Sequence, residues 1–164
     1  MILILEIIIT LLAVCVLALL VNHIEDSHKK TNLLSFAVTR ASELPVVKLY
    51  NNDKEFLFLI DTGSNYCIIN KESLPLLDHS IIEGATGEAY GMEGNVIQLS
   101  YAYIPLHSVD GVLFEDNFQV IDMSAAFGQL KENNGVEVVG ILGSKFLRRY
   151  SFTVDFKNLI AYTK

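Results

Sequence analysis

The sequence predicts an all-β domain with one or two short helices, preceded by a single N-terminal transmembrane helix. Three observations carry this prediction. Residues 2–21 are apolar except for Glu6 and Thr10, and about 20 such residues span a bilayer as a helix. After the first 32 residues, short runs of β-branched and aromatic residues alternate with turns rich in Gly, Asn and Asp. One such run, residues 56–60, is five apolar residues long and ends at Asp61, as a buried strand ending in a turn would.

Composition divides the chain of 164 residues into three parts. Residues 1–21 form the expected anchor, 22–32 a polar juxtamembrane linker, and 33–164 a segment of the size of one domain. The formal net charge is −7 and there is no basic cluster, so we expect no nucleic-acid partner. Cys15 and Cys67 lie in different parts and should not pair. No Cys/His spacing typical of a metal site is present, and we expect no metal and no cofactor.

A retained single-pass membrane anchor is the favoured interpretation of residues 2–21. A cleaved signal peptide is the alternative, but no basic residues precede the apolar run and residues 21–23 lack the small side chains of a cleavage site. Lys29, Lys30 and Arg40 follow the run, which favours a cytoplasmic domain by the positive-inside rule. An exported domain stays open.

Periodicity and turn residues place the elements of the domain in order. The expected strands are residues 35–39, 44–50, 56–60, 66–69, 118–122, 138–142, 152–156 and 159–162, with one long hairpin over 81–104. The expected helical pieces are 71–78, broken at Pro75, then 124–131 with Ser124 as N-cap, and 144–150 with Ser144 as N-cap. Residues 51–54 form a hairpin turn by composition.

Asp61-Thr62-Gly63-Ser64 can be interpreted in two ways. Asp commonly begins a turn because its side chain bonds the backbone two residues later, and Gly63 supplies backbone freedom. Alternatively, Asp61 is a catalytic carboxylate. A second segment favours catalysis: the apolar strand-like run 138–142 continues into Gly143 and Ser144, and a helix and a final strand are expected after it.

With these motifs the chain resembles the retropepsin-like aspartic proteases, the single-lobe relatives of pepsin. The matched features are the Asp61-Thr62-Gly63-Ser64 loop, a glycine-rich segment, and Ile141-Leu142-Gly143 leading into a helix and strand, over roughly residues 44–162. The resemblance implies a closed retropepsin-like acid-protease barrel lobe. It also implies hydrolysis of peptide bonds by a water activated between two carboxylates that share one proton.

The chain has one Asp-Thr-Gly, so the second carboxylate must come from another copy of Asp61. This chemistry therefore predicts a symmetric homodimer. By resemblance, Thr62 would brace the two active-site loops, Gly63 would let them approach, and Ser64 would bond the outer oxygen of Asp61. Residues 141–143 would pack beneath the loop, with Gly143 permitting a tight crossing. Residues 159–163 are the candidate dimer interface.

The hairpin over residues 81–104 is either an ordinary hairpin with glycines at bulges or a mobile flap that closes over a bound peptide. Glycine allows both movement and close approach to a ligand. Four glycines lie in its first half and centre: Gly84, Gly87, Gly91 and Gly94. The candidate flap residues that would contact substrate are Tyr90, Gly91, Met92 and Gly94.

The sequence thus favours a membrane-anchored aspartic endopeptidase, active as a homodimer on peptide or protein substrates, with Asp61 as its catalytic residue. A catalytically inactive retropepsin-like module for peptide binding or dimerisation is the alternative. It has no need of the intact Asp61-Thr62-Gly63-Ser64 motif. A small structural domain tethered to a membrane would leave the combined motifs unexplained.

Overall fold

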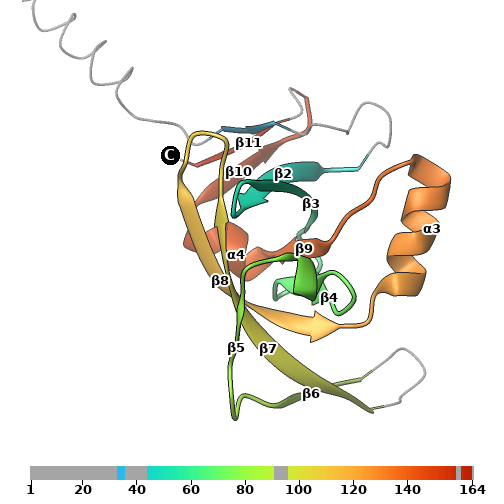
Figure 1. The fold of residues 1–164 in the computed structure, drawn as a ribbon. Coiled ribbons are helices and arrows are strands. Elements are labelled where there is room, and N and C mark those ends of the chain that lie inside the picture. Colours follow the sequence, from blue (N-terminus) through green and yellow to red (C-terminus); the bar gives the residue numbers. More distant parts are fainter. Residues whose placement is uncertain (1–32, 36–43, 91–95, 158–159, 164) are drawn as a thin grey trace, which may run out of the picture. The chain divides into compact units, whose positions relative to one another are not determined.

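The computed structural model describes residues 33–35, 44–90, 96–157 and 160–163 (Figure 1). The expected anchor (residues 1–21) and the whole expected linker (22–32) lie outside these ranges, as do residues 36–39 of the strand expected over 35–39. Within them no helix is long and apolar enough to cross a membrane. The described residues belong to one compact unit, and it is mostly β with two α-helices, which confirms the predicted β class.

An eight-stranded mixed sheet forms most of the described domain. Its strands are β2 (Val46–Asn51), β3 (Lys54–Asp61), β4 (Ile68–Asn70), β5 (Ser80–Ile81), β6 (Gly87–Tyr90), β7 (Val96–His107), β8 (Leu113–Ile121) and β9 (Gly140–Gly143). The order is β2-β3-β9-β4-β8-β7-β5, and β6 pairs with β7. Strand β7 also pairs with β2, with His107 opposite Tyr50. The sheet therefore closes on itself.

A second sheet of three antiparallel strands has the order β1 (Leu33–Ser35), β11 (Ile160–Thr163), β10 (Phe152–Asp155). Strand β11 lies in the middle, with Leu33 opposite Tyr162 on one side and Thr153 opposite Tyr162 on the other. Both backbone edges of β11 are therefore used within the chain. Pairing with a partner copy through the backbone of residues 160–163, one way of using the candidate interface, would require β1 or β10 to be displaced.

Three helical pieces connect the strands: the 3₁₀ turn η1 (Leu74–Leu76), α3 (Ser124–Asn134) and α4 (Ser144–Arg149). The prediction that Ser124 and Ser144 act as N-caps was wrong by one residue, because Met123 and Gly143 occupy the cap positions. The Asp122 carboxylate accepts the Ser124 N–H at 3.0 Å, and this bond holds the Asp122 pKa below its usual value. The Asp122 carboxylate therefore accepts a backbone N–H at the start of α3, the function expected of the Ser124 hydroxyl.

Alternate residues of β3 point into the core, which fixes how the strand delivers its last residue. Phe58 is fully buried and Ile60 is 5% exposed, so the side chain of Asp61, next in line, falls on the opposite face. Phe58 packs against Phe118 of β8, with ring centroids 6.1 Å apart. Removing these side chains from water stabilises the strand by roughly 1.5–3 kcal/mol each. The burial of β3 therefore holds Asp61 at the end of a rigid element.

Asn51 ends β2 and is 2% exposed. Its Nδ2 donates to the carbonyl oxygens of Asp78 at 3.0 Å and Pro105 at 2.8 Å, and its Oδ1 accepts the Asp78 N–H at 2.6 Å. Asn51→Ala leaves three backbone groups without partners. We expect it to lower the free energy of unfolding by about 2–4 kcal/mol in urea denaturation. Asn133→Ala on the exposed face of α3 is the matched control, expected to change it by less than about 0.5 kcal/mol. Equal effects of the two changes would contradict this role of Asn51.

Candidate active site

Asp61 is the last residue of β3, and the neighbouring strand β9 runs parallel to it. The register places Phe58 opposite Gly140 and Asp61 opposite Gly143. Figure 1 shows β9 entering beside β3 and continuing into α4. Because parallel strands end at the same edge of a sheet, the loop after Asp61 and the start of α4 meet there. The two motifs singled out in the sequence, residues 61–64 and 141–143, are thus brought together.

The loop after β3 holds the carboxylate of Asp61. The Gly63 N–H donates to Asp61 Oδ1 at 2.8 Å, and the Ser64 N–H donates to the Asp61 carbonyl at 3.2 Å. A Cβ at position 63 would lie 3.1 Å from Oδ1, closer than most real contacts. Asp61 is half-buried while Thr62 and Gly63 are exposed. The carboxylate is therefore fixed through one oxygen at an accessible position, as either a turn-forming or a catalytic Asp would be.

The start of α4 braces this loop from the other side. The Ser144 N–H donates to the Ser64 carbonyl at 2.7 Å, and the Lys145 N–H donates to the Asn65 carbonyl at 3.2 Å. At Gly143 the backbones approach so closely that a Cβ would lie 2.4 Å from the Tyr66 carbonyl oxygen. A side chain at position 143 would therefore clash with the backbone of Tyr66, while the role of Gly143 in supporting an active site stays a prediction. Its neighbours Ile141 and Leu142 are buried in two different apolar clusters, which anchors β9 on both faces.

Ser64 does not make the hydrogen bond expected of it. Its hydroxyl donates to the Tyr66 carbonyl at 2.8 Å, and its single proton cannot also reach Asp61. The expected bond to the outer oxygen of Asp61 was therefore wrong for the chain as described. Ser64 closes the loop on itself instead. The bracing role of Thr62, which needs a second copy, stays a prediction.

Cys67 lies in the core just after the loop, as the sequence suggested. It is 1% exposed, and its burial raises the pKa of the thiol well above the usual range. Its Sγ donates to Asp116 Oδ2 at 3.6 Å, while Arg149 Nη1 pairs with Asp116 Oδ1 at 3.0 Å. Sequence reasoning missed this Asp116–Arg149 pair, since the two residues are 33 positions apart with no motif joining them.

The expected hairpin is present as β6 and β7. Gly87 lies opposite Leu99 and Tyr90 lies opposite Val96, so the chain turns back between positions 90 and 96. The candidate flap residues Gly91, Met92 and Gly94 lie outside the described residues. A Cβ at Gly87 would lie 2.8 Å from the Tyr101 hydroxyl, so this glycine makes room for a tyrosine across the hairpin.

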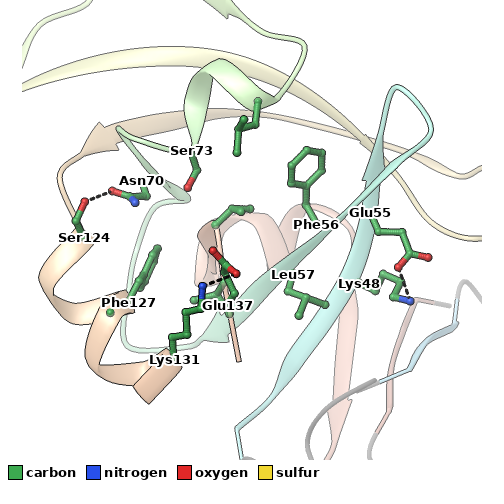
Figure 2. Close-up of a pocket in the computed structure, with 14 residues that line it drawn as sticks. Lys48, Glu55, Phe56, Leu57, Asn70, Ser73, Ser124, Phe127, Lys131 and Glu137 are labelled. Carbon is green, nitrogen blue, oxygen red and sulfur yellow. Dashed lines mark hydrogen bonds and ion pairs between the residues drawn. The ribbon is translucent and has the colours of Figure 1, made fainter. Parts of the chain in front are cut away.

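Two cavities bear on the site. One of about 400 Å³ adjoins the Asp61 loop and includes Tyr66 in its lining. The other, about 720 Å³, is shown in Figure 2; Phe56 and Phe127 line it, as does the ion pair between Lys131 and Glu137 at 2.8 Å. No residue of 61–64 lines this larger cavity. Both volumes lie in the range of ligand pockets. Residues 61–64 do not line the smaller cavity either, but its lining includes Tyr66 and Lys145, and the Lys145 N–H donates to the Asn65 carbonyl at the end of the Asp61 loop.

Among the described residues, no group of three or more His, Cys, Asp or Glu side chains is placed to hold a metal ion. The described site has one carboxylate, one backbone N–H that orients it, and a braced loop. A carboxylate placed in this way is able to accept or donate a proton.

Comparison with solved structures finds retropepsin-like aspartic protease domains. No family model matches the chain, and no curated protein matches it. One similar structure is the retroviral protease-like domain of Ddi1 from Leishmania major, with 18% identity and a TM-score of 0.42, covering 70% of this chain and 82% of that one. Another is a retropepsin-like aspartic protease from Rickettsia conorii, with 16% identity and a TM-score of 0.44, covering 80% of this chain and 97% of that one.

Proposed function

We propose that this chain is an aspartic endopeptidase with a retropepsin-like lobe, active as a homodimer and anchored to a membrane through residues 2–21. The observation that carries the proposal is the position of Asp61. It ends a buried strand, one of its oxygens accepts the Gly63 N–H, and its loop is braced by the first residues of α4. A carboxylate held rigidly at an accessible place is what general acid–base catalysis needs.

The second carboxylate is assigned to Asp61 of a second copy, because no other Asp in the sequence is followed by Thr-Gly. Two carboxylates close together share one proton, since both cannot ionise easily. The ionised one removes a proton from water as the water attacks the peptide carbonyl carbon. The protonated one donates its proton to the carbonyl oxygen, which gives a tetrahedral diol. The first carboxylate then gives the proton it took from water to the nitrogen, the C–N bond breaks, and a hydroxyl proton of the diol returns to the pair as the new carboxyl group forms. The Gly63 N–H fixes the plane of each carboxylate during these transfers.

Support for the membrane anchor is the length and composition of residues 2–21. An anchor would confine copies to one surface and raise their effective concentration, which favours the pairing that the chemistry needs. The side of the membrane that carries the domain is left open.

A catalytically inactive module for peptide binding or dimerisation is the second candidate. Two observations favour it: the Gly63–Asp61 bond is also the bond of a turn-forming Asp, and the larger cavity lies away from Asp61. Such a module would bind peptides without cutting them.

The first experiment incubates the full chain, in a mild detergent that preserves dimers, with a mixed peptide pool from acidic to neutral pH. Mass spectrometry then identifies new amino and carboxyl termini. We expect cleavage at internal bonds by the parent and none by Asp61→Asn. A folded dimer that binds peptides but generates no new termini would reject the protease and favour the binding module.

A mixing experiment tests whether each active site takes Asp61 from two copies. A fixed amount of wild-type chain is allowed to exchange with a ninefold excess of Asp61→Asn. Random pairing leaves about one wild-type chain in ten with a wild-type partner, so activity should fall to roughly a tenth. The control is an equal mass of serum albumin, which should not lower the activity. Activity that is unchanged by the variant would show that one copy is sufficient.

A further inference from the structure

The cavity of about 400 Å³ beside the active-site loop has a chemical character of its own. Its walls combine aromatic, aliphatic and cationic side chains. They include Tyr66, Ile82, Ala85, Tyr101, Lys145 and Arg149. None of these residues has a part in the proton transfers proposed above, so the cavity calls for a separate explanation.

The cavity lies where it could receive a side chain of a bound peptide substrate. Tyr66 follows Asp61 by five residues, and its carbonyl accepts the Ser64 hydroxyl proton at 2.8 Å. Ile82 and Ala85, which precede β6, also line the cavity, and the Ile82 N–H donates to the Tyr101 carbonyl at 2.9 Å. The cavity therefore lies between the Asp61 loop and the base of the β6–β7 hairpin. A peptide held across Asp61 beneath that hairpin would place a side chain there.

Three charged groups line the cavity, two cations and one carboxylate. The carboxylate, Asp116, is already engaged: Oδ1 accepts from Arg149 Nη1 at 3.0 Å and from the Asn117 N–H at 2.9 Å, and Oδ2 accepts from Cys67. Its side chain is 12% exposed. The Cys67 thiol stays protonated because burial raises its pKa, so it adds no negative charge. Arg149 and Asp116 thus largely compensate each other.

Lys145 is the cation that remains. Its Nζ lies 3.7 Å from the centroid of the Tyr66 ring, an arrangement that holds the ammonium over the aromatic face. In the part of the chain that the structure describes, no carboxylate lies within 4 Å of this nitrogen. Among the described residues the cavity therefore presents one positive charge that no carboxylate neutralises, next to apolar surface.

We propose that this cavity is a substrate subsite that selects a Glu or Asp side chain, with Lys145 as its charge partner. This inference rests on the proposed peptidase and adds the substrate class. The methylene groups of the acidic residue would pack on Tyr66, Tyr101 and Ala85, while its carboxylate pairs with the Lys145 ammonium. In a symmetric dimer each copy contributes one such subsite, so the preference should occur at two positions, placed symmetrically about the cleaved bond.

The test uses one peptide that the full chain cleaves, acetylated and amidated at its ends, so that side chains carry its only carboxylates. Each position is changed in turn to Glu, Asp, Gln or Lys, and kcat/KM is measured near pH 6. We expect Glu to exceed Gln by roughly threefold to tenfold at the subsite positions, the size of a partly screened ion pair. The preference should shrink as the pH falls through about 4.3, the pKa of a free Glu side chain, and should be lost by about pH 3.

Three variants at one position identify the charge partner. Lys145→Arg should keep the preference for Glu, Lys145→Gln should abolish it, and Lys145→Glu should reverse it in favour of Lys. Lys54→Glu is the matched control for Lys145→Glu, because it changes the net charge by the same amount. Lys54 is exposed and lies at the end of β3 that is far from Asp61. It should leave the Glu-to-Gln ratio unchanged. A peptide with Gln at the subsite and a free C-terminus tells whether a terminal carboxylate is accepted as well.

A binding measurement tests the acidic subsite independently of peptide cleavage. The same peptides, labelled with a fluorophore, are titrated with the Asp61→Asn full chain and followed by fluorescence anisotropy. Tighter binding of Glu peptides that depends on Lys145, with no cleavage by the wild type, would reject the peptidase but support the acidic subsite. Cleavage with no preference for Glu at any position, or a preference that survives Lys145→Glu, would overturn the subsite and leave the peptidase standing.

Discussion

Asp61→Asn is expected to lower peptide cleavage by on the order of a thousandfold or more while leaving the folded dimer intact. An amide can neither take a proton from water nor donate one as a carboxylic acid does, and this type of catalysis contributes about 10²–10⁴-fold for a positioned group. The fold should survive, because the amide oxygen of Asn still accepts the Gly63 N–H that Oδ1 accepts at 2.8 Å. Initial rates on one cleaved peptide measure the loss, and circular dichroism and sedimentation measure fold and assembly.

Asp53→Asn is the matched control for this change. Asp53 lies in the exposed turn between β2 and β3, at the far end of the strand that carries Asp61, and its φ of 61° is one that Asn also adopts readily. The same chemical change there should leave the rate within about twofold, as expected of a surface substitution. If Asp61→Asn kept more than about a tenth of the parent rate, general acid–base catalysis by Asp61 would have to be abandoned.

Gly143→Ala is expected to destabilise the domain by about 3 kcal/mol or more, at the upper end of the cost of overpacking. A Cβ at this position would lie 2.4 Å from the Tyr66 carbonyl oxygen and 2.6 Å from its carbonyl carbon. These are backbone atoms, and the loop that holds them is fixed by the Ser64 and Ser144 hydrogen bonds, so little can move aside. Urea denaturation of the purified variant would measure the loss, and a chain that fails to fold would be the extreme of the same effect.

Gly128→Ala provides a control with the opposite sign. Gly128 lies inside α3, and no heavy atom outside its own helix lies within 4 Å of a Cβ built there. Alanine should stabilise this helix by about 0.5–1 kcal/mol, because glycine loses more backbone freedom on folding. If both variants changed stability by the same amount, the close crossing at Gly143 would not be the reason for its glycine.

The parts of the fold that depend on local pattern were predictable. The apolar run before Asp61 forms strand β3, and the run before Gly143 forms β9. Asn51 pairs with Lys54, so the predicted hairpin turn is present at residues 52–53. These elements are specified by short-range features, namely apolar length, β-branching and turn residues. That β3 and β9 lie side by side did not follow from pattern. The family resemblance implied only that residues 141–143 pack beneath the Asp61 loop.

The polar half of β8 could not be predicted. A strand was expected over residues 118–122, yet β8 begins at Leu113 and includes Glu115, Asp116 and Asn117. These three residues suggest a loop by composition. They are extended because β7 lies alongside, with Ile104 opposite Asp116, and long-range pairing of this kind overrides propensity.

The hydrogen-bond partners of Ser64 and Ser124 could not be predicted from the sequence either. Each has a suitable position for the function expected of it, but a competing group lies nearby: the Tyr66 carbonyl for Ser64 and the Asp122 carboxylate for the N–H of residue 124. The choice between such partners depends on distances that only the folded chain fixes. The same holds for the acidic subsite, whose wall residues span positions 66 to 149.

The position of β11 between β1 and β10 means that the described domain begins and ends at the same place. Leu33 is the Cα partner of Tyr162, which places the two backbones about 5 Å apart. A few residues could join these ends directly, and new ends could be opened in the exposed bend at residues 109–111 between β7 and β8. Such a circularly permuted domain would no longer continue from the apolar N-terminal segment. It offers a way to ask whether two copies find each other without any tether.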